Sequence, residues 1–463
     1  MAGATSVAGI TGLAGCTGGG GGGEGGDGGD GGDGGNGGDG GDGGSDGGGG
    51  SEYPEIGNYT PGLDAGEEDV VFGFNVPQSG SYSAEGEDEL RAYKLAVKHL
   101  NNGGGWVDDW DNLSGEGVLG NKVTSVNGDT ATDPDTGRQS ASRMIQRDNV
   151  IMFSGGSSSA VAIAQQGLAQ EEKVQFMACM THSNDTTGKN CVRYSFRECF
   201  NAYMTGKALA PVLKEEYGEG LKFYQLYADY SWGQTQQASM KQFLTDVAGW
   251  EQVDSVATPL GTSDFSNYLS DAANSGADVL ILNHYGLDAA NSLPQAVDAG
   301  IKEDMKIVVP LYNRLMAEAA ADSIEGVYGT VAWTSLIDNE YSNAFTEAFG
   351  NEYNGRIPSG PALLAYAQTL QYAAAVERAG TFYPPEVIKQ LEGHQYDNVG
   401  YGQEEMRKCD HQAFHKIPVV KGLPKSEQEE GKYFELVNQT PRDDISYGCD
   451  EGPAAKCELG GYK

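Results

Sequence analysis

The sequence has few basic residues: 30 Lys and Arg stand against 66 Asp and Glu, which gives a formal net charge of −36. A field of this sign repels phosphate backbones over the whole surface, so we exclude a nucleic-acid-binding protein. No apolar run approaches the roughly 20 residues that a membrane-spanning helix needs, which excludes an integral membrane protein. The chain also lacks a G-x-S-x-G elbow, an H-E-x-x-H motif, a Walker loop and a dinucleotide fingerprint, so we expect no enzyme.

The acidic excess is not confined to one tract. Seven acidic residues lie within residues 17–50, so the rest of the chain still has 59 acidic and 30 basic residues, a net charge of −29. Like charges at this density destabilise a compact protein unless salt screens them. The composition therefore indicates a high-salt habitat, such as that of a halophilic archaeon.

Residues 1–16 form a segment of small and apolar residues that ends in Leu13-Ala14-Gly15-Cys16. This ending resembles the lipobox of secreted lipoproteins, in which the cysteine becomes the lipid-bearing N-terminus. The resemblance predicts an export signal over residues 1–16 and a lipid anchor at Cys16. No basic residue precedes the apolar stretch, which departs from the lipoprotein pattern. A chance LAGC sequence in a disordered tail stays the alternative.

Residues 17–50 are nearly all Gly and Asp, with GGD as the repeated unit. No apolar side chain is available there to offset the entropy of ordering the backbone. Calcium-binding Gly-Asp repeats need an interleaved apolar residue in each repeat, and this tract has none. We expect a flexible, disordered tether over residues 17–67.

From Val70 onward, short apolar runs alternate with amphipathic stretches and glycine-rich joints, a pattern typical of βα units and parallel sheets. Residues 90–100 carry apolar groups at helical spacing, and the glycine-rich run 101–105 ends this helix. The sequence therefore predicts an α/β fold. The strands that we expect are 70–74, 150–153, 175–178, 222–226, 278–282 and 306–309.

Five segments in this region, taken in order, resemble the leucine/isoleucine/valine-binding family of transporter-associated solute-binding proteins. They are SGSYSAEGEDELRAYKLAVKHLNNGGG, FSGGSSSAVAIAQQGLA, THSNDTTG, RYSFRECFNAYMTGKALAP and ADYSWGQ, and Cys409-Asp410-His411-Gln412 adds a late sixth. The resemblance runs from about Val70 to Lys421. It implies a type I periplasmic-binding-protein fold, with two Rossmann-like lobes joined by three crossings. By this resemblance lobe 1 is 68–199 plus 330–396, and lobe 2 is 200–329 plus 397–463.

In open α/β sheets, ligands lie beyond the carboxyl ends of the strands, where loops and helix N-termini present free N–H groups. Ser157, Ser158 and Ser159 follow a predicted strand and open a predicted helix. The resemblance implies that one of these three serines contacts the ligand. A serine that only caps the helix is the alternative.

A second loop with hydroxyl groups follows the next predicted strand. The resemblance implies a ligand-binding hydroxyl there, at Thr181 or Ser183. Local capping by Asn184 and Asp185 is the alternative.

Aromatic residues are expected on the side of the second lobe. The resemblance places Trp232 and Tyr285 over the ligand, where rings bury apolar surface and exclude water. It also implies that Glu85 faces the cleft with Tyr82 beside it. Core packing is the alternative for the two rings, and an exposed surface position is the alternative for Glu85.

One departure from the family bears on the ligand. Amino-acid-binding members present an acidic residue to the ammonium group after a strand-ending proline, whereas this chain has Leu311 there, followed by Tyr312. We count Tyr312 among the ligand-binding candidates. The amine of an amino acid would need Glu85 or Asp185 instead, which shifts the expectation toward amides, urea-like compounds or other small polar solutes.

Six cysteines remain besides Cys16, and an even number in an exported chain permits three disulfides. Fifteen pairings are possible, of which Cys449 with Cys457 and Cys191 with Cys199 are closest in sequence. A zinc site around Cys409, His411 and His415 is the competing interpretation, but the chain has no CxxC motif. We expect no metal and no cofactor.

Together these features predict a lipid-anchored receptor on the outer face of the cytoplasmic membrane. It captures a small polar solute, such as a branched-chain or other amino acid, an amide or a urea-like compound, and delivers it to the permease subunits of an ABC transporter. A sensory receptor that binds a ligand and a surface adhesin or structural protein are the alternatives.

Overall fold

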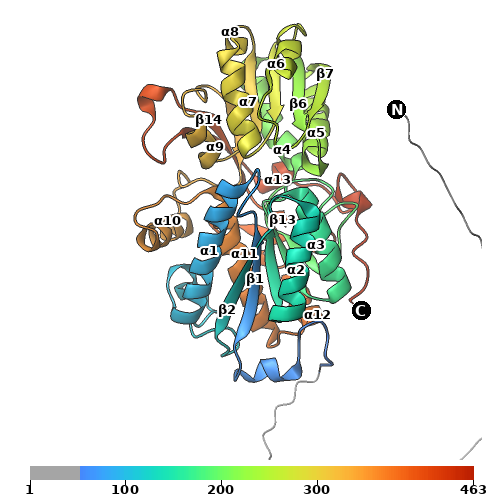
Figure 1. Ribbon diagram of the computed structural model, residues 1–463, viewed down its shortest axis with the longest axis vertical. Coiled ribbons are helices and arrows are strands. Elements are labelled where there is room, and N and C mark those ends of the chain that lie inside the picture. Colours follow the sequence, from blue (N-terminus) through green and yellow to red (C-terminus); the bar gives the residue numbers. More distant parts are fainter. Residues whose placement is uncertain (1–52, 463) are drawn as a thin grey trace, which may run out of the picture. The chain divides into compact units, whose positions relative to one another are not determined.

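The computed structural model describes residues 53–462 of the chain (Figure 1). The predicted export signal, the predicted anchor at Cys16 and the glycine-rich tract 17–50 lie outside the described residues. Within residues 53–462, no helix combines the length and apolar character that crossing a membrane requires. Two mainly parallel sheets organise this part of the chain.

The first sheet has five parallel strands in the order β2-β1-β3-β4-β5. They are β1 (Val70–Val76), β2 (Val123–Asp129), β3 (Met152–Gly156), β4 (Gln175–Cys179) and β5 (Ser195–Arg197). Most of these strands are buried, as expected for parallel strands that helices cover on both faces.

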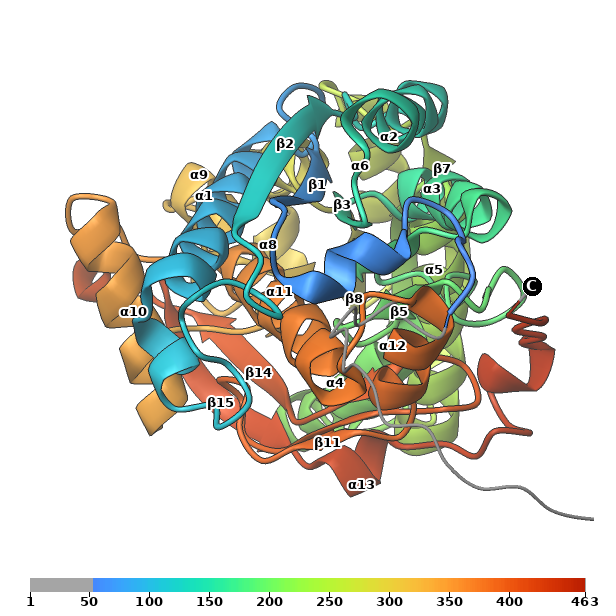
Figure 2. The same ribbon diagram turned by 90° about the horizontal axis from the view of Figure 1, so that it is seen from below.

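Helices cover the two faces of this first sheet (Figure 1). Helix α1 (Ser83–Asn102) packs on α11 (Gly360–Ala379), and α2 (Pro134–Asp148) packs on α3 (Ser159–Glu172). Helix α11 is buried from Gly360 to Val376, and α12 (Pro384–Leu391) packs beside it (Figure 2). A segment far along the chain therefore completes the core around the first sheet.

The second sheet has seven strands in the order β15-β14-β10-β9-β8-β6-β7. They are β6 (Lys222–Ala228), β7 (Glu251–Thr258), β8 (Val279–Asn283), β9 (Lys306–Tyr312), β10 (Tyr328–Val331), β14 (Ile417–Gly422) and β15 (Phe434–Thr440). The strands β6 to β10 are parallel, and β14 and β15 extend the sheet antiparallel. The associated helices are α4 (Ala202–Tyr217), α5 (Ser231–Ala248), α6 (Ser266–Ala273), α7 (Leu287–Asp298), α8 (Ile301–Asp304) and α9 (Arg314–Ala319).

Smaller elements complete the described chain. A three-stranded antiparallel sheet contains β11 (Gln395–Tyr396), β12 (Glu404–Met406) and β13 (Ala413–Phe414). The remaining helices are η1 (Pro61–Ala65), η2 (Gly105–Asp108), α10 (Glu340–Glu352), η3 (Lys425–Glu427), α13 (Arg442–Ile445) and η4 (Ala454–Lys456). The residue limits predicted for the two lobes stay a prediction.

The α/β fold predicted from the sequence is confirmed, and each of the six expected strands overlaps an observed one. The strand expected at 150–153 begins two residues late, at Met152. The Val150 carbonyl accepts a hydrogen bond from Asn58 Nδ2 at 2.9 Å. The helix expected at 90–100 begins earlier, at Ser83, and ends at Asn102, before the capping residue Gly103, where φ is +74°.

The tether prediction is wrong for residues 53–67. Tyr59 and Leu63 are buried, and the Tyr59 hydroxyl donates to Asp64 Oδ2 at 2.6 Å. The ring of Tyr53 stacks on Tyr383 with centroids 4.6 Å apart. Residues 53–67 differ from the tract before them because they carry apolar side chains that can be buried.

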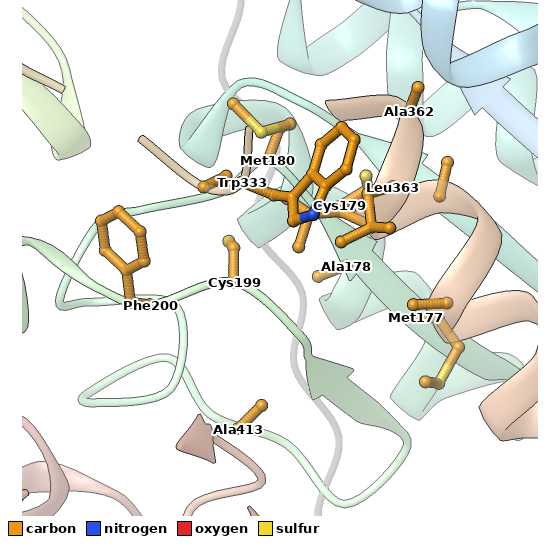
Figure 3. Close-up of a cluster of buried hydrophobic side chains, with 14 of the residues drawn as sticks. Met177, Ala178, Cys179, Met180, Cys199, Phe200, Trp333, Ala362, Leu363 and Ala413 are labelled. Atoms are coloured by element: carbon orange, nitrogen blue, oxygen red, sulfur yellow. The ribbon is translucent and has the colours of Figure 1, made fainter. Parts of the chain in front are cut away.

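The cysteine pairings closest in sequence do not form. The disulfides are Cys191–Cys457 and Cys409–Cys449, with Cα–Cα distances of 5.5 Å and 6.1 Å. The permitted third disulfide is absent from the described residues, because Cys179 and Cys199 are free thiols inside a buried hydrophobic cluster (Figure 3). Sequence separation was a poor guide because the fold brings residues 457–462 back beside the segment that leads into β5, where Cys457 meets Cys191 and the Tyr462 carbonyl accepts from the Tyr194 hydroxyl at 2.6 Å.

Candidate functional site

The carboxyl ends of β3 and β4 have unusual backbone conformations. Gly155 and Gly156 have φ values of +125° and +97°, and the next residue, Ser157, has a φ of +55°. After β4, Met180 has a φ of +49°. Left-handed conformations at residues with a side chain cost of order 1–3 kcal/mol each and cluster at ligand sites. The two strand ends are therefore candidates for ligand contact.

The three predicted serines have different partners. The Ser157 hydroxyl donates to the carboxylate of Glu89, with oxygen distances of 2.8 and 2.9 Å. The Ser159 hydroxyl accepts from the backbone N–H of Ser183 at 3.1 Å. Ser158 occupies the N-cap of α3 without a side-chain capping bond, and its buried hydroxyl has no hydrogen-bond partner among residues 53–462. Helix capping therefore does not account for Ser158.

Thr181 and Ser183 are both buried but have different surroundings. The Thr181 hydroxyl lies 2.9 Å from that of Thr186, within its own loop. The Ser183 hydroxyl lies 2.7 Å from that of Ser231, at the start of α5. The Ser183 hydroxyl thus contacts α5, a helix of the second sheet, whereas the Thr181 hydroxyl bonds within its own loop.

The buried guanidinium of Arg197 fixes the loop that carries both residues. It donates to the carbonyl of Thr181 at 2.7 Å and to the carbonyl of Ser183. It also donates to Gln412 Oε1 from Nε at 2.7 Å. Arg197 therefore ties this loop to the segment that precedes β13.

Four aromatic residues, which we call the aromatic cluster, lie together: Tyr82, Trp232 and Tyr285 are buried, and Tyr230 is half-buried. The ring of Tyr285 is 5.5 Å from that of Tyr82 and 6.3 Å from that of Trp232, centroid to centroid. The hydroxyls of Tyr82 and Tyr230 lie 2.7 Å apart. In the described part of the chain Trp232 Nε1 has no hydrogen-bond partner, although the side chain is 2% exposed.

Three buried carboxylic side chains lie on one face of α1, which we call its acidic face: Glu85, Asp88 and Glu89. Glu85 Oε1 accepts from Asn313 Nδ2 at 3.0 Å, and the same Nδ2 donates to the Tyr285 hydroxyl at 2.5 Å. Burial raises the pKa of Glu89 to about 8, and burial also raises the pKa of Glu85. The acidic face therefore adjoins the aromatic cluster.

Two sequence candidates lie apart from this arrangement. The ring of Tyr312 packs on Phe434 at 4.9 Å, and it has no ring contact with the aromatic cluster in the described residues. Asp185, one candidate for holding an amine, forms an ion pair with Lys189 at 2.8 Å. Glu85 is thus the better placed of the two candidate carboxylates.

Sequence reasoning missed Glu89, Asn313 and Tyr230. Glu89 stands four residues after Glu85, the spacing that brings two side chains to one face of a helix. A prediction that began this helix at Ser83 would therefore have placed Glu89 beside Glu85. Asn313 follows the last residue of β9, and Tyr230 comes two residues after β6. Both positions are at the carboxyl ends of strands, where ligand-binding loops are expected.

Hydrogen bonds join the loops of the first sheet to those of the second, along what we call the seam. On one side the seam contains Ser81, Tyr82 and Ser183, and on the other Tyr230, Ser231 and Leu287. The backbone N–H of Leu287 donates to the Ser81 carbonyl at 3.1 Å. The aromatic cluster therefore lies where the two sheets meet through their loops.

No group of three or more His, Cys, Asp or Glu side chains within residues 53–462 is arranged to hold a metal ion. The zinc alternative named Cys409, which forms a disulfide with Cys449. His411 lies against Glu392, with Nε2 3.2 Å from Oε1.

Residues 69–427 match the sequence profile of the family described as periplasmic binding protein. The chain belongs to this family. A Leu/Ile/Val-binding protein homolog 8 from Brucella abortus is 27% identical over 334 residues, which cover 69% of this chain and 79% of that protein.

Solved structures of periplasmic binding proteins share the fold. An amino acid ABC transporter substrate-binding protein from Pseudomonas fluorescens has a TM-score of 0.74 at 22% identity, covering 85% of this chain and 99% of that one. A solute-binding protein of an ABC transporter from R. palustris, in complex with benzoate, has a TM-score of 0.69 at 17% identity, covering 81% and 97%.

Proposed function

We propose that this periplasmic binding protein is the extracellular solute-binding component of an ABC importer. It captures a small polar solute between two lobes, one built on each sheet. The observation that carries the proposal is the aromatic cluster at the seam, because its residues lie just beyond the carboxyl ends of strands of both sheets. Sites of this kind, apolar walls with a few polar groups, are typical of small-molecule binding.

Two unpaired donors support a ligand at this place. The Ser158 hydroxyl and Trp232 Nε1 are buried without a hydrogen-bond partner in the described chain. Buried polar groups in folded proteins nearly always have a partner, so a bound solute would supply what the protein does not. We propose that Tyr82, Glu85, Ser157, Ser158, Ser159, Ser183, Trp232 and Tyr285 form the ligand site, with Thr181 shaping its loop and Tyr312 outside it.

The proposal extends to location and partners. Lipid attachment at Cys16 would hold the protein on the outer face of the cytoplasmic membrane, where permease subunits would receive the solute. We expect Cys16→Ser to release the protein into the medium or leave it uncleaved. Unchanged membrane fractionation of this variant would contradict the anchor.

A ligand screen tests the binding function. We expect a solute from a set of amino acids, amides and urea to raise the melting temperature in high salt, because a ligand that binds the native state stabilises it by mass action. An adhesin would show no such rise with any solute. A sensory receptor would show the same rise, and loss of solute uptake in a deletion strain would separate importer from sensor. Turnover of the bound solute would indicate an enzyme.

A further inference from the structure

A short motif that accepts N-linked saccharides in secreted proteins occurs four times in the described chain. The motif is Asn-x-Ser or Asn-x-Thr, where x is not proline, and the asparagine amide nitrogen takes the sugar. Its copies are Asn58-Tyr59-Thr60, Asn112-Leu113-Ser114, Asn184-Asp185-Thr186 and Asn438-Gln439-Thr440. A pattern of three residues also arises by chance, so the surroundings of each amide nitrogen decide which copy is a modification site.

The amide nitrogen of Asn58 is fully used inside the fold. Its Nδ2 donates to the Ile145 carbonyl at 2.8 Å and to the Val150 carbonyl at 2.9 Å. These two bonds engage both hydrogens of the NH2 group, and they join Asn58 to α2 and to the segment before β3. A sugar on Nδ2 would replace one of these hydrogens, so the folded chain leaves no place for a saccharide at Asn58.

Asn112 and Asn184 use their amide nitrogens to contact helices, and both side chains are half-buried. Asn112 Nδ2 donates to the carbonyl of the buried Ala374 in α11 at 3.0 Å. Asn184 Nδ2 donates to the Ser239 hydroxyl in α5 at 3.1 Å, and Asn184 Oδ1 accepts from the Tyr203 N–H at 2.8 Å. A saccharide on either nitrogen would have to separate the loop from the helix that it contacts.

Asn438 differs from the other three because its side chain is exposed and bonds only within its own motif. It lies on β15, and its Nδ2 donates to the Thr440 hydroxyl at 3.2 Å. This is the only hydrogen bond of the Asn438 side chain within residues 53–462. One of the two amide hydrogens is therefore free, and a sugar can replace it while the other keeps the bond to Thr440.

The strand that carries Asn438 is open on one side. Strand β15 is the last strand of the seven-stranded sheet, and its outer side pairs with no other strand of the described chain. Between Leu436 and Asn438 the pairing with β14 shifts, and Val437 is the extra residue of this bulge. The apolar side chain of Val437 is 42% exposed. A saccharide on Asn438 would thus meet no neighbouring strand, and it would lie beside an exposed apolar residue.

We propose that Asn438 carries an N-linked saccharide. The donor is a lipid-linked sugar phosphate, and a glycosyltransferase on the outer side of the membrane transfers the sugar. Asn438 Nδ2 bonds to the anomeric carbon, the bond from that carbon to the phosphate oxygen breaks, and the lipid phosphate leaves with the electron pair. One amide proton passes to a base of the transferase.

This inference rests on the extracellular location in the proposed function and not on solute binding. The disulfides Cys191–Cys457 and Cys409–Cys449 support that location, because disulfides persist in oxidising compartments. An exported protein that binds a solute but carries no saccharide would overturn the modification alone. An exported protein that carries the saccharide but binds no solute would overturn the binding function alone.

Mass spectrometry of the protein isolated from the organism that produces it tests the site. After proteolysis, we expect the peptide that contains Asn438 to carry a saccharide, and the peptides with the other three acceptor asparagines to be unmodified. An unmodified Asn438 would overturn the inference. A saccharide on Asn58, Asn112 or Asn184 would show that the amide contacts do not select the site.

Substitutions expressed in the same cells test the motif. Asn438→Gln removes the acceptor nitrogen, and Thr440→Val replaces the hydroxyl of the motif with a methyl group. We expect both variants to lose the saccharide-bearing form, seen as faster migration in gel electrophoresis. Gln439→Ser keeps an Asn-x-Thr motif and is the matched control, which should migrate as the wild type does.

The folded state of the variants is checked by the melting temperature. Asn438 is exposed, so Asn438→Gln should leave the melting temperature nearly unchanged and gives a clean test even if Thr440→Val fails to fold. A saccharide-bearing band that persists in folded Asn438→Gln would overturn the site. Its disappearance in folded Gln439→Ser would contradict recognition of the motif.

Discussion

At the scale of single residues, Trp232 separates a role in binding from a role in packing. Trp232→Phe keeps most of the buried ring but removes Nε1–H, which has no partner among the described residues. We expect the free energy of unfolding without solute to change little, whereas solute affinity falls about tenfold, the effect of about 1.4 kcal/mol.

Trp250→Phe is the control for Trp232→Phe. Trp250 Nε1 donates to the Gly218 carbonyl at 2.9 Å, far from the aromatic cluster in the chain. Loss of this hydrogen bond in Trp250→Phe should lower the free energy of unfolding by about 1 kcal/mol and leave the solute affinity unchanged. Chemical denaturation and calorimetry measure the two quantities. The reverse pattern, with Trp232→Phe destabilising and binding normally, would remove Trp232 from the site.

Glu404 offers a second test, through pH. Its buried carboxyl accepts from Gln371 Nε2 at 2.7 Å, and burial, with the neighbouring Glu198 carboxyl, raises the pKa of Glu404 well above its usual value. A carboxyl whose folded-state pKa is raised contributes stability below its unfolded pKa, and this stability is lost as pH rises through the folded pKa. We therefore expect the stabilising contribution of the protonated Glu404 carboxyl to be lost with increasing pH above its usual pKa of 4.5.

Glu404→Gln should remove this part of the pH dependence, since an amide does not titrate. The wild-type free energy of unfolding should fall by up to about 1.4 kcal/mol per pH unit relative to the variant. Denaturation at fixed salt between pH 5 and pH 9 measures the difference. Parallel curves for wild type and variant would show that Glu404 takes up no extra proton on folding.

At the scale of elements, the loop 181–187 depends on one side chain. The buried guanidinium of Arg197 donates to two of its carbonyls and to the Thr187 hydroxyl at 2.5 Å. Arg197→Met leaves these acceptors buried without donors, so we expect a loss of about 3–5 kcal/mol in the free energy of unfolding. Arg197→Lys should recover part of it.

An exposed arginine provides the comparison for Arg197. Arg147 pairs with the adjacent Asp148 and is largely exposed, so Arg147→Met should change stability by less than about 0.5 kcal/mol. Both variants are compared by chemical denaturation. A loss for Arg197→Met no larger than that for Arg147→Met would contradict the role of Arg197 in fixing the loop.

The elements were more predictable than the contacts between them. The strand at 70–74 could be predicted because an apolar run between polar joints is a local pattern, and so is the helix at 90–100. The bond from Asn313 to Glu85 joins residues 228 apart, and no local pattern encodes it. The same holds for the disulfide Cys191–Cys457, and for Tyr59, whose burial depends on a surface that the rest of the fold provides.

At the scale of the whole molecule, charge should control stability. The acidic excess remains −29 outside residues 17–50. Dilution from 1 M to 0.1 M salt lengthens the Debye distance from about 3 Å to about 10 Å, so repulsion extends across many more pairs of carboxylates. We expect the melting temperature to fall on this dilution, as measured by calorimetry. A melting temperature that stays flat or rises would contradict adaptation to high salt.

The contacts of residues 53–67 also determine how a mechanical load enters the protein. Asp64 accepts from the Thr381 hydroxyl at 2.8 Å and from the Phe382 backbone at 2.9 Å, and Tyr53 stacks on Tyr383. All three partners lie between α11 and α12, beside the first sheet. A force applied to the chain before Tyr53 would therefore act on the first sheet and its helices, and it would place no tension on the seam. Under the proposed function, a load applied on the N-terminal side of Tyr53 would therefore not oppose closure on the solute.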